Sequence, residues 1–202
     1  WRVSGIGRFA EALHTPDGEL ENTGFASFNG DAAVGLHGTS GSSQLRIAHY
    51  AGEFKLLEAN GPPPGQKEGE EEGPERKASD DRVQLSGNTL WHGLRFEGKA
   101  QFQRHSLIEV SDDTVGVTPA LFRALDTQAK KQESEAFNLL LNTASLDLLA
   151  HHLDGANFRG TVGLSGMSQK NDSKGPIFFV PDATISSGAA FALEEATFGP
   201  LT

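Results

Sequence analysis

The chain has 202 residues, a formal net charge of −10 and no cysteine. The missing cysteines exclude disulfide scaffolds, thiolate zinc sites, iron–sulfur clusters and cysteine nucleophiles. The acidic balance argues against a nucleic-acid partner, because phosphate binding needs clustered lysine and arginine. No run approaches the roughly 18 consecutive apolar residues of a membrane-spanning helix, so we expect no transmembrane segment.

Residues 1–59 predict short strands separated by glycine-rich turns. Phe25–Phe28 is followed by Asn29-Gly30, a strong turn pair. The segment Leu45–Tyr50 alternates apolar and polar residues, which is typical of a half-buried strand.

Residues 60–82 differ in composition from the rest of the chain. They contain Pro62–Pro64 and a run rich in glycine and glutamate over Glu68–Glu75. Such a segment buries too little apolar surface to offset its ordering entropy. We interpret it as an acidic loop inserted into a single β-rich domain that covers residues 1–202.

Strand patterns resume over residues 83–117, and a helix is predicted after them. Thr118 is a good N-cap and Pro119 suits the first helical position. Apolar residues then recur at helical spacing up to about Lys131.

The C-terminal part returns to β patterns. Residues 135–153 suit either one helix or two strands, and Asn142-Thr143 slightly favours two strands. Phe158–Leu164 alternates like a strand, Ser168–Lys174 reads as a polar loop, and Ser187–Leu193 reads as a short helix. Glycines at regular spacing complete the prediction of an all-β fold: an antiparallel β-sandwich or barrel-like domain with one or two short helices.

No motif of catalysis stands out. Gly5–Ala10 has the form of a dinucleotide loop, but no strand–helix–strand pattern surrounds it. The adjacent pairs His151-His152 and Glu194-Glu195 point to different faces of any element, so neither suits one metal ion or one catalytic dyad. We therefore expect a protein that is not an enzyme, although scattered carboxylates leave a carbohydrate-active β domain as an alternative.

The segment Phe96–His105 carries the most informative pattern. Gly98, Ala100 and Phe102 stand two residues apart, and the segment ends at His105. This resembles the core signature of HtaA-type haem-binding domains, which place an aromatic-x-Gly, then a phenylalanine, then a histidine on a β-strand. The resemblance implies haem binding, with the histidine hydrogen-bonded to the axial haem ligand.

Further segments resemble the same family in the same order. The chain opens with Trp1, as these domains tend to do. Val110–Asp113 is similar to the acidic turn of the family, Ala144–Leu148 to its later alanine-leucine strand, and Val180–Phe191 to its closing segment. The resemblance covers nearly the whole chain, with residues 60–82 as an insertion.

One departure concerns the axial ligand, which in the family is a tyrosine soon after the opening tryptophan. Here Arg8–Leu13 contains no tyrosine, and Tyr50 is the only one in the chain. Phenolate is a good ligand for ferric haem. Tyr50 is therefore the candidate metal ligand, provided that its strand lies beside His105, and its neighbour His49 would then point to the other face.

The sequence thus predicts an extracytoplasmic haem-binding or haem-relay domain, secreted or in the cell envelope, whose partner is haem or a haem-carrying protein. Tyr50 and His105 would contact the cofactor, and Phe96, Phe102 and Trp91 are candidate apolar walls. The alternative is a cell-surface scaffold or protein-interaction domain without haem, in which the same residues only pack the fold. Because the chain begins at Trp1, we expect any export signal to lie outside it.

Overall fold

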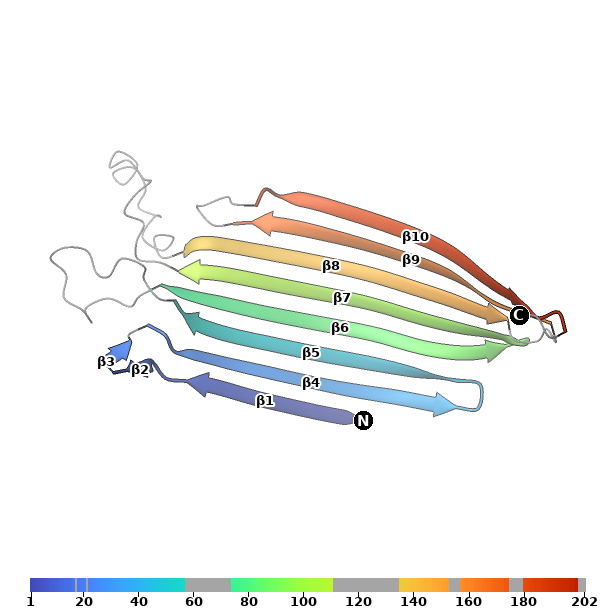
Figure 1. The fold of residues 1–202 in the computed structure, drawn as a ribbon, viewed down its shortest axis with the longest axis horizontal. Helices are drawn as coiled ribbons and strands as arrows, with labels where there is room; N and C mark the ends of the chain where they lie inside the picture. The colour runs from blue at the N-terminus through green and yellow to red at the C-terminus, as the bar shows by residue number, and fades with distance from the viewer. Residues whose placement is uncertain are drawn as a thin grey trace.

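The computed structural model describes residues 1–16, 18–20, 22–56, 74–110, 135–152, 157–174 and 180–199. Every regular element in these ranges is a β-strand. Eight strands form one antiparallel sheet in the order β1-β4-β5-β6-β7-β8-β9-β10, and β2 and β3 form a separate hairpin (Figure 1). The prediction of an all-β, antiparallel fold is confirmed.

The strands follow one another across the sheet in chain order, apart from the small hairpin. Their bounds are β1 (Arg2–Ala10), β2 (Leu13–Thr15), β3 (Gly18–Leu20), β4 (Phe25–Gly38), β5 (Gly41–Lys55), β6 (Glu75–Trp91), β7 (Leu94–Val110), β8 (Glu135–His152), β9 (Phe158–Ser173) and β10 (Ala183–Ala196). At about 3.3 Å per residue, strands of this length make the sheet roughly 50 Å long.

The hairpin between β6 and β7 shows how local sequence sets the register. His92 has a φ of 49° and Gly93 a φ of 80°. Positive φ at both central residues matches the twist of the flanking strands, and glycine adopts it without steric cost. Trp91 consequently pairs with Leu94, and the register continues without a shift to Arg76 opposite Glu109.

Several expected breaks between elements are absent because pairing on both sides overrides the local signals. Asn29-Gly30 lies inside β4, where β1 and β5 pair with it, and makes no turn. Residues 135–152 form one strand, β8, in place of two. The expected polar loop at Ser168–Lys174 is largely the end of β9, and the helix expected at Ser187–Leu193 is wrong, because β10 pairs with β9 along its whole length.

The boundary of the acidic loop also needs correction. Glu75–Arg82 are the first residues of β6 and pair with β5, so a loop spanning 60–82 extends too far toward the C-terminus. Residues 60–73 and the helix expected at 118–131 lie outside the described residues. In the part of the chain that is described, no helix is long and apolar enough to cross a membrane.

The two faces of the sheet differ sharply in composition. Residues directly opposite one another on neighbouring strands share a face, and alternate residues along a strand change face. We call the face that carries Tyr50 the polar face; it includes Arg46, Arg82, Gln84, Gln101, Gln103, Thr143, Ser145 and Gln169. The apolar face carries Val34, Leu45, Ile47, Val83, Leu85, Phe102, Leu146, Leu148, Val162 and Leu164.

The apolar face is open to solvent in the described structure. Its ten large side chains named above are 38% to 59% exposed, and Ala33 is the one buried hydrophobic residue among the described residues. The described residues therefore form a single-layer sheet without a conventional core, whereas stable domains pack at least two layers around one.

Candidate functional site

Tyr50 and His105 lie on the same face of the sheet, one strand apart. Tyr50 on β5 is directly opposite Asp80 on β6, and Asp80 is directly opposite His105 on β7. With about 4.8 Å between neighbouring strands, the backbones of Tyr50 and His105 are roughly 10 Å apart. The three residues form a row across the polar face.

Asp80 orients the histidine of this row. The Nδ1 atom of His105 lies 2.8 Å from Oδ2 of Asp80, and Nε2 of Gln103 donates to Oδ1 of Asp80 at 2.6 Å. The side chains of His105 and Asp80 are each 30% exposed. Holding one ring nitrogen by a carboxylate fixes the imidazole plane and leaves Nε2 for a ligand, an arrangement that recurs around metal-ligating histidines.

The phenol of Tyr50 lies over Gly52, two residues further along β5. A Cβ at Gly52 would collide with the Tyr50 hydroxyl and lie 2.8 Å from Cε2 of Phe54. Phe54 in turn stacks on Phe25 of β4, with ring centroids 6.1 Å apart and planes 18° apart. Glycine at position 52 therefore permits an aromatic cluster of Tyr50, Phe54 and Phe25.

Apolar residues from neighbouring strands adjoin this cluster. Ala78 of β6 is opposite Gly52, and Leu107 of β7 is opposite Ala78. Leu141 of β8 is opposite His105. We call this part of the polar face the apolar corner; it consists of Phe25, Phe54, Ala78, Leu107 and Leu141. The row of Tyr50, Asp80 and His105 lies along its border.

No hydrogen bond joins Tyr50 and His105 in the structure. The resemblance to HtaA-type domains implies such a bond, but here Asp80 stands between the two residues and holds the histidine. Sequence reasoning missed Asp80 because it fell within the expected acidic loop. Lys77–Arg82 shows no alternation of apolar and polar residues, so no local pattern marked the earlier start of the strand.

The expected aromatic walls do not belong to this site. Phe102 is opposite Val83 and Phe96 is opposite Thr89, which places both phenylalanines on the apolar face, and Trp91 on β6 shares that face. Successive side chains of a strand point to opposite faces. Positions 102 and 105 differ by three, an odd number, so Phe102 and His105 lie on opposite faces. His49 also lies on the apolar face, as expected, and its Nδ1 is 2.7 Å from Oδ1 of Asp81.

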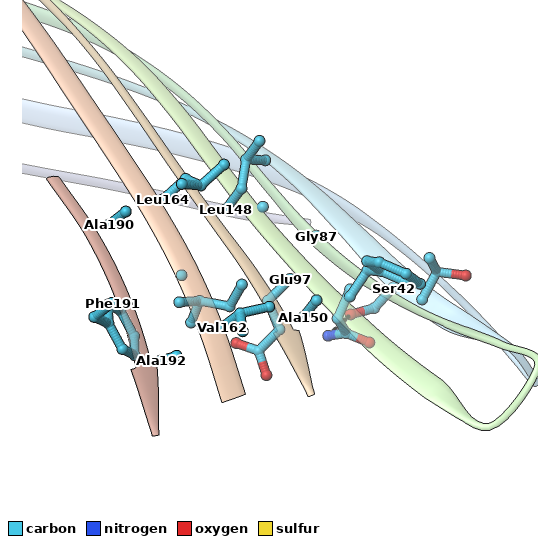
Figure 2. Close-up of a pocket in the computed structure, with 16 residues that line it drawn as sticks. Ser42, Gly87, Glu97, Leu148, Ala150, Val162, Leu164, Ala190, Phe191 and Ala192 are labelled. Carbon is cyan, nitrogen blue, oxygen red and sulfur yellow. Dashed lines mark hydrogen bonds between the residues drawn. The ribbon is translucent and has the colours of Figure 1, made fainter. Parts of the chain in front are cut away.

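A shallow hollow of about 960 Å³ lies on the apolar face near the start of β7 (Figure 2). Phe96, Leu148, Val162, Leu164 and Ala190 line it. No histidine or tyrosine is among its lining residues, so it offers neither of the donors considered for haem iron. Along β7, nine residues separate Phe96 from His105, a distance of roughly 30 Å.

Glu75, the first residue of β6, is buried and forms an ion cluster with two lysines. Its side chain accepts from Nζ of Lys55 at 2.7 Å and also contacts Lys77. Burial alone would raise the pKa of Glu75, but hydrogen bonds from Lys55 and Lys77 outweigh that cost and lower the pKa to about 2. The carboxylate is thus a structural anion of the folded chain.

Within the described ranges, no three His, Asp or Glu side chains converge to hold a bare metal ion. No known protein-family model and no curated protein matches the sequence. The resemblance to HtaA-type domains therefore stays a prediction.

Proposed function

We propose that this chain binds haem, or relays it, on the polar face at the row of Tyr50, Asp80 and His105. The observation that carries the proposal is the juxtaposition of a phenol and a carboxylate-held imidazole on one face. Both are established types of axial haem ligand.

In this proposal Tyr50 would hold the haem iron, and His105 would lie beside the bound group. Haem bound there would supply a ferric iron, for which a phenolate oxygen is a suitable donor. Asp80 keeps the His105 ring upright, with Nε2 directed away from the carboxylate. Ligation by Nε2 of His105 in place of Tyr50 is the other outcome that the spectrum distinguishes.

The apolar corner supports the proposal in place of the walls expected from the sequence. Phe25, Phe54, Leu107 and Leu141 provide the apolar surface that a porphyrin ring needs, next to a polar edge. Tyr50 and His105 are half-buried, so haem could enter and leave from solvent. That exchange suits a binding or relay domain that performs no chemistry on the porphyrin.

The test is a titration with hemin, monitored by absorption spectroscopy. We expect the wild-type chain to give a phenolate-type spectrum that is lost in Tyr50→Phe and weakened in His105→Ala. His49→Ala is the matched control, because His49 adjoins Tyr50 in sequence but lies on the opposite face. A spectrum of free hemin with the wild-type chain contradicts the proposal.

A secreted or cell-envelope location belongs to the same proposal, with haem or a haem-carrying protein as the partner. The second candidate is a cell-surface scaffold or protein-interaction domain without haem. The observation that favours it is the exposed apolar face, since patches of this extent commonly mark contact surfaces.

The finer form of the fold is also proposed. A sandwich or a barrel-like closed sheet would both turn the apolar face inward and supply the core that a single layer lacks. In either form the row of Tyr50, Asp80 and His105 stays on the outer, solvent-facing side. The haem proposal is therefore independent of which form is correct.

A further inference from the structure

We infer that the open sheet has a closed state in which β1 pairs with β10 and the apolar face turns inward. Among the described residues each of these strands has one partner, β4 for β1 and β9 for β10, so within that part of the chain each presents a free edge of backbone donors and acceptors. Free edges promote association between chains unless the protein covers or closes them.

Strand direction permits this pairing. Every neighbouring pair in the eight-stranded sheet is antiparallel, so the first and the eighth strand run in opposite directions. β1 has nine residues and β10 has fourteen, so the whole of β1 fits against part of β10. The new contact would be one more antiparallel ladder.

Side-chain size across the apolar face favours closure. The middle of each edge strand presents small residues there, Gly5 and Gly7 on β1 and Gly188, Ala190 and Ala192 on β10, while Val3 and Phe9 lie nearer the two ends of β1. The inner strands present most of the large ones. An eight-stranded closed sheet has an interior just wide enough for side chains to fill, so small residues at the seam leave room for large residues from across.

Closure of the sheet would also fill the hollow on the apolar face. Ala190 and Ala192 of β10 border it, beside Val162 and Leu164 of β9 (Figure 2). In a closed sheet, large side chains of the opposite strands, such as Leu36 and Leu45, would fill this space. The hollow is then unfilled core volume of the open state.

Charged residues do not oppose closure. On the apolar face, Asp81, Arg104 and Lys170 lie in one row toward the end of the sheet where β5 and β7 finish, and Asp81 is already paired with His49. Glu53 and the ion cluster of Lys55, Glu75 and Lys77 lie on this face closer still to that end. Toward the other end of the sheet, Glu194 is paired with His152 at 2.7 Å. A closed sheet would thus have an apolar middle between two charged mouths that water can reach.

A second copy is the main competing cover for the apolar face. Ten large side chains spread over six strands make a patch of roughly 700 Å², close to one side of a standard interface. A copy packed face to face would cover this patch but would leave both sheet edges free. Closure removes the exposed face and the free edges together, so we favour it.

The test uses engineered disulfides, which the cysteine-free chain makes straightforward. Ile6→Cys is combined in turn with Ser187→Cys, Ala189→Cys, Phe191→Cys and Leu193→Cys, all on the polar face. Ile6→Cys with Asn29→Cys is the positive control, because these residues are directly opposite in β1 and β4. Ile6→Cys with Ser145→Cys, on the distant strand β8, is the negative control.

We expect one β1–β10 pair, or two adjacent ones, to form a disulfide within a monomer at a yield near that of the positive control. Mass spectrometry measures the bond and sedimentation equilibrium measures the oligomeric state. Yields no higher than for the Ser145 control overturn the inference. A stable dimer without β1–β10 bonds overturns it in favour of a second copy. Neither result bears on hemin binding by the polar face.

Discussion

His105 and Asp80 pair directly across β7 and β6, with Nδ1 of the imidazole 2.8 Å from Oδ2 of the carboxylate. Tyr50 flanks Asp80 from the other side, on β5. Asp80 is thus the link between the two residues that the sequence suggested for haem, and it is the residue whose replacement is most informative.

Asp80→Asn should weaken hemin binding about 10- to 100-fold, because loss of the residue that orients a ligand-side histidine typically has that effect on metal affinity. Asp81→Asn is the matched control. It removes the adjacent carboxylate, which holds His49 on the apolar face, and should leave hemin affinity unchanged. Equal loss in both variants, measured by absorption titration, would mean that charge alone attracts hemin.

Gly52→Ala should destabilise the chain by about 1–3 kcal/mol, because its Cβ would displace the Tyr50 hydroxyl and crowd Phe54. The cost should be smaller in a Tyr50→Phe background, which lacks the hydroxyl. A double-mutant cycle from chemical denaturation measures this coupling. Strictly additive effects would show that Tyr50 does not lie over Gly52.

Glu75 should make stability depend on acid. Its folded-state pKa of about 2 lies below the ordinary value of 4.5, so its stabilising contribution is present above pH 4.5 and is lost as the pH falls toward 2. The contribution is at most about 3 kcal/mol. Denaturation of the wild-type and Glu75→Gln chains should differ most near neutral pH and converge at the acid end. A difference that does not change with pH contradicts the assignment.

Leu85→Glu and Gln84→Glu compare the two faces at adjacent positions of β6. If the sheet closes, Leu85→Glu buries a charge and should cost more than about 3 kcal/mol, whereas Gln84→Glu should stay within about 0.5 kcal/mol. Leu85 is 55% exposed on the open sheet, where the same substitution would have little effect. Equal unfolding free energies for the two variants would argue that the apolar face stays in water.

The sequence was sufficient to predict the class of fold, because apolar and polar residues alternate in segments such as Leu45–Tyr50 and Lys99–Gln103. It was insufficient for the ends of strands. Asn29-Gly30 and Ser168–Asn171 carry turn or loop residues, yet pairing on both sides keeps each in a strand. The helix expected at Ser187–Leu193 failed because small residues such as Gly188 and Ala190 have no strong period of their own.

The candidate site could be predicted only in part. That Tyr50 and His105 share a face depends on two registers. The turn at His92-Gly93 sets that of β6 against β7, but no local pattern encodes that of β5 against β6. The sequence alone could have excluded Phe102 from the site of Tyr50 and His105. Positions 102 and 105 differ by an odd number, so on one strand the two side chains lie on opposite faces. Asp80 and Gly52 were beyond reach, because their roles arise from contacts across strands.

The most direct test of the haem proposal is the affinity and stoichiometry of hemin for three forms of the chain. The account predicts one hemin per wild-type chain, no specific binding by the Tyr50→Phe/His105→Ala double variant, and wild-type affinity for Phe102→Ala on the opposite face. Binding that survives in the double variant but is lost in Phe102→Ala would place the ligand on the apolar face and contradict the account.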